Sequence, residues 1–391
     1  MTLVNDIDYG VGIGAIRDLL ARNGIEPSDV GQLHRIKDVK LFQQGAKVDQ
    51  FDADGNVIGQ TLQVQDLASI ILSPKWESGP AWPVAVPGPL VKLKPVNSSS
   101  LVVSKTGFSK AVIWPDMQIG YFHGKDGLVS THDEGAIDLA LELTKTINPS
   151  LVVLVGDNLD APEFGKYRLS PAFRGTMQAA IDYATELMFR IRAVAPAAKI
   201  VWLAGNHEER ISNMLIDNAV AAFGLRQGNV PEGWPVLSVP HLCRLDESGV
   251  EYIAGYPAGK FWINERLKVI HGTRVKSNGS TAHIYLGQEK TSTLYGHIHR
   301  TELALRTFDK WEGPKTILAA SPGCLAKITG EVPSSKGGID LHGRPLTVVE
   351  DWQQGVGVVT YETDGEHRFF YENVSFIEGL AMYHGKLYGN L

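Results

Sequence analysis

Five short apolar segments of the chain each end in residues that can bind a metal ion. These residues are Asp116, Asp157, Asn206, His271, His297 and His299. A mixture of carboxylate, amide and imidazole ligands suits a first-row dication, either manganese, iron or zinc. The lack of thiolates among them argues against a structural zinc site. Two ions that share one carboxylate can acidify a water molecule and clamp the attacking and departing oxygens of an in-line displacement.

The segments before these residues read as the strands of an α/β fold. The expected strands cover 111–114, 151–155, 199–204, 267–270 and 293–295. The expected helices cover 133–147, 171–194 and 208–223. Ligands of open α/β sheets gather at the carboxyl ends of the strands, which is where the candidate metal ligands lie. The pattern therefore predicts layered sheets with helices outside them and one metal site at the strand ends.

The residues around the strand ends form five blocks in a characteristic order. The blocks are Asp116-x-Gln118, Gly156-Asp157-x-x-Asp160, Gly205-Asn206-His207-Glu208, His271-Gly272 and Gly296-His297-x-His299. This series resembles the calcineurin-like metallophosphoesterase superfamily over about residues 108–330. The resemblance implies a four-layered α/β/β/α sandwich and an enzyme that hydrolyses phosphoesters with a metal-activated hydroxide.

The resemblance also implies a role for each residue of the blocks. Asp157 would bridge two divalent metal ions, most plausibly Mn²⁺, with Fe or Zn as alternatives. Asp116 and His299 would bind the first ion, and Asn206, His271 and His297 the second. His207 would be the general acid, since imidazole titrates near neutral pH. Glu208 would orient His207, and Asp160 would have a structural role or support the ligands from behind.

The first block departs from the family pattern, which is usually Asp-x-His. Gln118 stands at the histidine position and offers only a neutral carbonyl oxygen to a metal. Three interpretations stay open: Gln118 is a ligand, the first metal binds poorly, or the site is a non-catalytic scaffold. A Gln here also resembles the manganese-dependent ADP-ribose/CDP-alcohol diphosphatases. His123 could replace the missing imidazole, although its distance along the chain favours a loop position.

The chain before the catalytic blocks has a different composition. Residues 1–75 are expected to form a small α+β module, with a helix near Ile16–Leu20 and a β-hairpin whose turn is Asp52–Asn56. That turn lacks the glutamate that a calcium loop needs. Residues 76–107 form a Pro/Gly-rich linker, and 108–391 form the catalytic domain.

Composition and charge limit the possible substrates and the possible location of the protein. The net charge of −6 argues against a non-specific binder of long duplexes, and no apolar run is long enough to span a membrane. Two cysteines and no signal-peptide pattern indicate a cytoplasmic protein. The arrangement of a small module before the catalytic domain resembles that of bacteriophage-encoded phosphoesterases. Such an origin would place the protein in the host cytoplasm.

The leading hypothesis is a phosphodiesterase acting on nucleic-acid ends, short single strands or nucleotides. Lys166, Arg168 and Arg174 are the candidate substrate-binding residues, because they follow the bridging carboxylate in an insert that also carries aromatic side chains. The alternative enzyme is a phosphomonoesterase for protein or small-molecule substrates. The non-enzymatic alternative is a binding scaffold on the same fold.

Overall fold

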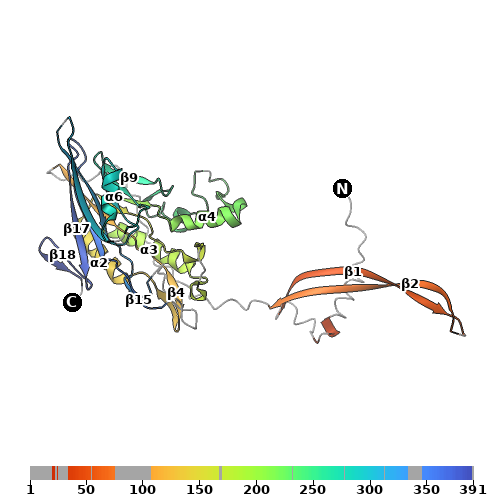
Figure 1. The fold of residues 1–391 in the computed structure, drawn as a ribbon. Helices are drawn as coiled ribbons and strands as arrows, with labels where there is room; N and C mark the ends of the chain where they lie inside the picture. The colour runs from red at the N-terminus through yellow and green to blue at the C-terminus, as the bar shows by residue number, and fades with distance from the viewer. Residues whose placement is uncertain are drawn as a thin grey trace. The chain divides into compact units, whose positions relative to one another are not determined.

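The computed structural model describes most of the 391-residue chain. The described residues are 20–22, 24, 34–53, 55–74, 107–166, 170–230, 232–276, 278–311, 313–332 and 346–389. The chain divides into two compact units, residues 1–84 and 85–391 (Figure 1). The boundaries expected near residues 75 and 107 stay predictions, since residues 75–106 lie outside the described part.

The first unit contains the β-hairpin that the turn residues predict. Strand β1 (His34–Phe51) pairs antiparallel with β2 (Val57–Pro74). The Asp52 carboxylate accepts a hydrogen bond of 2.8 Å from the backbone N–H of Asn56. The predicted helix lies almost entirely outside the described residues.

Two large sheets form the centre of the second unit. In spatial order, the eight-stranded sheet contains β19 (Lys386–Tyr388), β18 (Leu380–Tyr383), β17 (Phe369–Ile377), β16 (Gln354–Glu362), β3 (Phe108–Trp114), β6 (Leu151–Leu154), β7 (Lys199–Leu203) and β8 (Val250–Ile253). The five-stranded sheet contains β12 (Thr301–Phe308), β13 (Lys315–Pro322), β11 (Ser292–Tyr295), β10 (Leu267–Ile270) and β9 (Lys260–Asn264). Two short pairs, β4 (Tyr121–Gly124) with β5 (Gly127–Ser130) and β14 (Thr329–Gly330) with β15 (Val348–Val349), stand apart from these sheets.

The central strand β3 shows why the sheets are covered on both faces. Val112 and Trp114 pack in the core that also contains residues of α2 (Glu134–Ile147) and α3 (Met177–Val194). Ala111 and Ile113 point the other way, into a core that also contains residues of the second sheet. Successive side chains of a strand face opposite sides, so a strand that is apolar throughout is buried on both.

A third core completes the layers. It packs α6 (Thr281–Gln288) against the outer face of the five-stranded sheet, through Tyr285 and Leu286 on the helix and Tyr295 and Ile317 on the strands. The order is therefore helices, sheet, sheet, helix, which confirms the predicted α/β/β/α sandwich.

Two of the expected helices are shorter than the sequence indicated. The stretch 171–194 is broken: a 3₁₀ turn, Pro171–Phe173, precedes α3. Helix α4 (Glu208–Asn218) ends well before residue 223, and a second 3₁₀ turn, Val220–Ala222, follows it. By contrast, α2 begins where expected, because the Asp133 side chain accepts the N–H of Ala136 and caps it.

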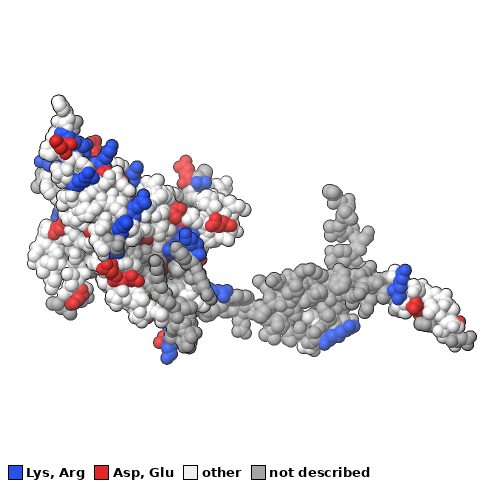
Figure 2. All heavy atoms as spheres, viewed as in Figure 1, with Lys and Arg blue, Asp and Glu red and all other residues white. Residues whose placement is uncertain are grey.

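The surface of the described residues carries mixed charge. On the face shown in Figure 2, Lys and Arg side chains are scattered among Asp and Glu. This face therefore lacks the continuous basic band that a binder of long duplexes uses. None of the described helices combines the length and apolar character needed to cross a membrane.

Candidate metal centre

The sheet topology brings the five strand ends together. Strands β3, β6 and β7 are parallel neighbours in one sheet, and β10 and β11 are parallel neighbours in the other. Two groups of potential ligands result: Asp157 with His271 and His297, and Asp116 with Asp157 and His299. Within each group the candidate ligand atoms all lie within 4.8 Å of one another. Asp157 belongs to both, so one carboxylate is placed where it could bridge two ions.

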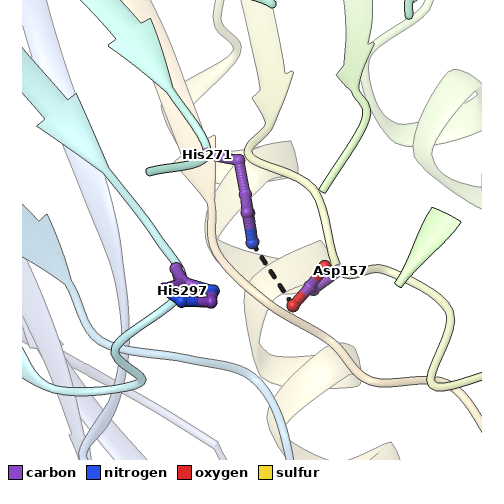
Figure 3. A group of neighbouring side chains, drawn as sticks. All are labelled: Asp157, His271 and His297. Atoms are coloured by element: carbon purple, nitrogen blue, oxygen red, sulfur yellow. Dashed lines mark ion pairs between the residues drawn. The ribbon is translucent and has the colours of Figure 1, made fainter. Parts of the chain in front are cut away.

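The second half-site is the set Asp157, Asn206, His271 and His297. His271 is oriented from behind, because its Nδ1 lies 2.9 Å from the carbonyl oxygen of Val155 and donates to it. Its Nε2 then faces the Asp157 carboxylate at 3.3 Å and the Asn206 side-chain oxygen at 3.1 Å. Figure 3 shows His271 pointing toward Asp157, with His297 beside them. A hydrogen bond that fixes one imidazole nitrogen and frees the other is typical of metal-binding histidines.

The first half-site is the set Asp116, Gln118, Asp157 and His299. The His299 Nε2 lies 3.3 Å from Asp116 and 3.4 Å from the amide nitrogen of Gln118. That amide nitrogen also lies 3.3 Å from Asp157, so the Gln118 side chain points into this group. Among the described residues, no donor satisfies the buried Oε1 of Gln118. Rotation of the amide about its last bond would turn this oxygen toward the ligands.

The donor set fits divalent cations. Burial lowers the pKa of His271, but the Asp157 carboxylate raises it more, so the pKa rises to about 9. Burial also lowers the pKa of His297, and the nearby His271 lowers it further, to about 4. The second half-site thus favours positive charge at His271 and keeps the imidazole of His297 neutral, as a metal ligand must be.

The backbone at this site adopts the left-handed conformation unusually often. Gln118, Asp157, His297 and His299 have φ values of 52°, 50°, 71° and 56°. Residues with a Cβ adopt this conformation at a cost, and such strain is concentrated at functional sites. The neighbouring Gly205 is needed for space, because a Cβ there would overlap Oδ1 of Asp157.

His207 lies beside the second half-site, at the N-terminus of α4. Its Nε2 is 3.6 Å from the Asp157 carboxylate, and its Nδ1 is 3.3 Å from that of Asp160. Burial lowers the pKa of His207, but Asp157 and Asp160 raise it more, and the net shift is upward. Arg210 also contacts this ring, with Nη2 2.7 Å from Nε2.

Glu208 has a different environment from the one expected. Its carboxylate accepts hydrogen bonds from the backbone N–H groups of Asp157, Asn158, Leu159 and Gly205, at 2.8–3.3 Å. It therefore ties the loop after β6 to the loop after β7. The imidazole of His207 instead lies between Asp160 and Arg210, at 3.3 Å and 2.7 Å.

The insert after Asp160 is organised by a residue that the sequence did not single out. The Glu163 carboxylate accepts the N–H groups of Gly175, Thr176 and Met177 at 2.7–2.8 Å and so caps α3. Lys166 and Arg174 are exposed on this insert, and Arg168 lies outside the described residues.

His123 does not replace the missing imidazole of the first block. Its Nε2 lies 3.0 Å from the carbonyl oxygen of Arg174, away from both ligand groups. The first half-site therefore depends on Gln118 where the family pattern has a histidine.

Two aromatic residues that the sequence analysis missed flank the ligands. Trp352 packs edge-to-face on His299, with 4.1 Å between ring centroids, and Tyr256 packs similarly on His271 at 5.6 Å. Both come from loops far along the chain from the blocks they contact. Neither had a local signal that could have identified it.

A comparison with protein families agrees with the fold. The family model for calcineurin-like phosphoesterases matches residues 122–347, which is more than half of the chain. The chain belongs to the calcineurin-like phosphoesterase family. It is accordingly a metal-dependent phosphoesterase, and the resemblance to this family is confirmed.

The other comparisons add little. A search of curated protein sequences finds no match. Among solved structures, the chain is similar to Yfce, a phosphoesterase from E. coli, at 12% identity, with 68% of this chain and 98% of that chain covered. The TM-score of that superposition is 0.24, so it carries no argument here.

Proposed function

We propose that the protein is a dinuclear phosphodiesterase that acts on nucleic-acid ends, short single strands or nucleotides. The observation that carries the dinuclear part is the position of Asp157, whose carboxylate belongs to both ligand groups. Bound divalent ions, with manganese the first candidate, would supply Lewis-acid activation of water and of a phosphoryl oxygen. Asp116, Gln118 and His299 would hold one ion, and Asn206, His271 and His297 the other.

The protein groups around the ions have separate tasks in this proposal. His207 would donate a proton to the departing oxygen, since its Nε2 lies on the side of Asp157. Asp160 would keep the ring in place through Nδ1, and Glu208 would hold the two ligand loops together through their amides. Lys166, Arg168 and Arg174 would meet the charge of the substrate beyond the phosphoryl group.

The preference for nucleotide-like diesters is supported by the aromatic residues. Trp352 lies against His299 of the first half-site and Tyr256 against His271 of the second, so each half-site has an aromatic neighbour. Stacking on aromatic rings holds nucleobases with little regard to sequence. A bacteriophage origin and a host-cytoplasmic location remain part of the proposal.

Turnover of paired chromogenic esters tests this function. Manganese-loaded protein should hydrolyse bis-p-nitrophenyl phosphate faster than p-nitrophenyl phosphate, by about tenfold in kcat/KM or roughly 1.4 kcal/mol of transition-state free energy. A preference for the monoester would refute the diesterase and favour a phosphomonoesterase. Metal-loaded protein that hydrolyses neither ester, nor ADP-ribose, cyclic nucleotides, RNA or single-stranded DNA, would favour a scaffold.

A further inference from the structure

Arg210 connects the general-acid candidate to the loop after the bridging carboxylate. It lies in the first turn of α4, three residues after His207, and its side chain is 19% exposed. Its Nη1 donates a hydrogen bond of 2.6 Å to the carbonyl oxygen of Asp160. Its Nη2 lies 2.7 Å from Nε2 of His207. One end of the guanidinium is thus bound to backbone, and the other faces the active centre.

The contact with His207 has a direction that chemistry fixes. A guanidinium has N–H donors and no acceptor, so Nε2 of His207 must accept from it. In the neutral ring, the proton then resides on Nδ1, which faces Asp160 at 3.3 Å. In this arrangement Nε2 cannot donate a hydrogen bond to a leaving oxygen. The pair as it stands is therefore a resting arrangement of the site.

An incoming phosphoryl group offers Nη2 a better partner than the imidazole. A phosphate oxygen carries negative charge whereas a neutral imidazole does not, so the hydrogen bond from the guanidinium to phosphate joins two opposite charges. Nε2 of His207 lies 2.7 Å from Nη2 and 3.6 Å from the Asp157 carboxylate. A phosphoryl group held against Asp157 would thus come within reach of Arg210.

We infer that Arg210 is the residue that recognises the phosphoryl group, by moving Nη2 from His207 to a non-bridging phosphate oxygen while Nη1 stays on the Asp160 carbonyl. The exchange frees Nε2 of His207 from the guanidinium, so this nitrogen can take up a proton from solvent water and then donate it to the departing oxygen. This inference rests on the proposed function of the same site. It adds a positively charged side chain, which is not one of the metal ligands, to the substrate contacts that the blocks imply.

Equilibrium binding of inorganic phosphate tests the inference without any turnover. Calorimetric titration of the manganese-loaded full-length protein should show phosphate binding that Arg210→Gln weakens by about tenfold, equal to one charge-assisted contact. Arg210→Lys should weaken it by about threefold, because an ammonium group cannot form the paired bonds. The matched control is Arg226→Gln, since Arg226 is an exposed arginine whose Nε donates to a backbone carbonyl, that of Gly233, elsewhere in the unit.

The outcomes separate recognition from a purely structural link. Undiminished phosphate affinity in Arg210→Gln, or no phosphate binding by the wild-type protein, would overturn the inference. The inference would also be overturned if Arg210→Gln lowers the melting temperature and the metal content but leaves the phosphate affinity per bound metal unchanged. Arg210 would then only stabilise the loop that contains Asp160. If Arg210→Gln does not fold, wild-type affinity in Arg210→Lys decides against the inference. Wild-type protein that binds phosphate but cleaves no diester would refute the proposed function alone.

Discussion

The two half-sites share one carboxylate but differ in how firmly their other ligands are held. In the second half-site, the Val155 carbonyl fixes the His271 ring, and Asn206 adds an oxygen at 3.1 Å. In the first, the Nδ1 of His299 has no hydrogen-bond partner among the described residues, and Gln118 contributes a neutral amide. Support behind the ligands commonly changes metal affinity by about 10–100-fold. We therefore expect the second half-site to fill first and the first half-site to determine the requirement for added metal.

Removal of the shared carboxylate charge should have the largest effect. In Asp157→Asn both half-sites lose their common anionic ligand, so bound metal should fall to near zero and kcat/KM by about 10³-fold or more. Elemental analysis and ester turnover measure the two effects, with the exposed Asp246→Asn as the control. Retention of one tightly bound ion would show that the half-sites are less dependent on Asp157 than their geometry indicates.

Acidification should weaken metal binding at the second half-site. The pKa of His271 is raised to about 9, because the Asp157 carboxylate outweighs the effect of burial, so at neutral pH a metal ion must displace a proton from Nε2. His297, whose pKa is lowered to about 4, has no proton to lose. Manganese affinity should therefore rise about tenfold per pH unit as the pH increases toward 9, with one proton released per ion.

Titration of metal binding between about pH 6 and 9, in two buffers of different ionisation enthalpy, counts the protons released. The exposed His241→Asn variant is the control. Release of no proton, or of two protons, per bound ion would contradict the difference between the pKa values of His271 and His297.

Conversion of Gln118 to histidine should reduce the difference between the half-sites. Gln118→His supplies the imidazole of the usual family pattern and should tighten the weaker manganese site by about tenfold. Gln118→Leu, of similar size without a donor atom, should loosen it. Titration with manganese, monitored through the electron paramagnetic resonance signal of the free ion, gives the dissociation constants of the two metal sites. Equal affinities in all three proteins would mean that residue 118 is not a ligand.

The sequence predicted the strand ends that carry the candidate ligands, because each strand end depends on a local pattern. An apolar strand buried on both faces followed by a polar residue is visible at Asp116, Asp157 and His271, and parallel pairing then brings the strand ends together. The same reasoning gave the layers of the sandwich. These features depend on strand periodicity, which neighbouring residues in the chain reveal.

The contacts that orient the site were beyond sequence reasoning. The pairing of His207 with Asp160 and the packing of Trp352 on His299 join residues that are 47 or more positions apart, and nothing in their neighbours fixes their direction. Glu208 was assigned to its sequence neighbour, whereas its carboxylate caps four amides of two loops. The end of α4 at Asn218 was also missed, since the apolar residues 219–223 continue past it.

The left-handed backbone at Gln118, Asp157, His297 and His299 has a consequence for how quickly the centre exchanges ions. This conformation costs roughly 1–2 kcal/mol per residue, and folding of the surrounding loops meets that cost before any ion arrives. The ligands are then aimed in advance, so capture of an ion requires the loss of water from the ion and little movement of the chain. We accordingly expect the rate of metal uptake to follow the water-exchange rate of each ion.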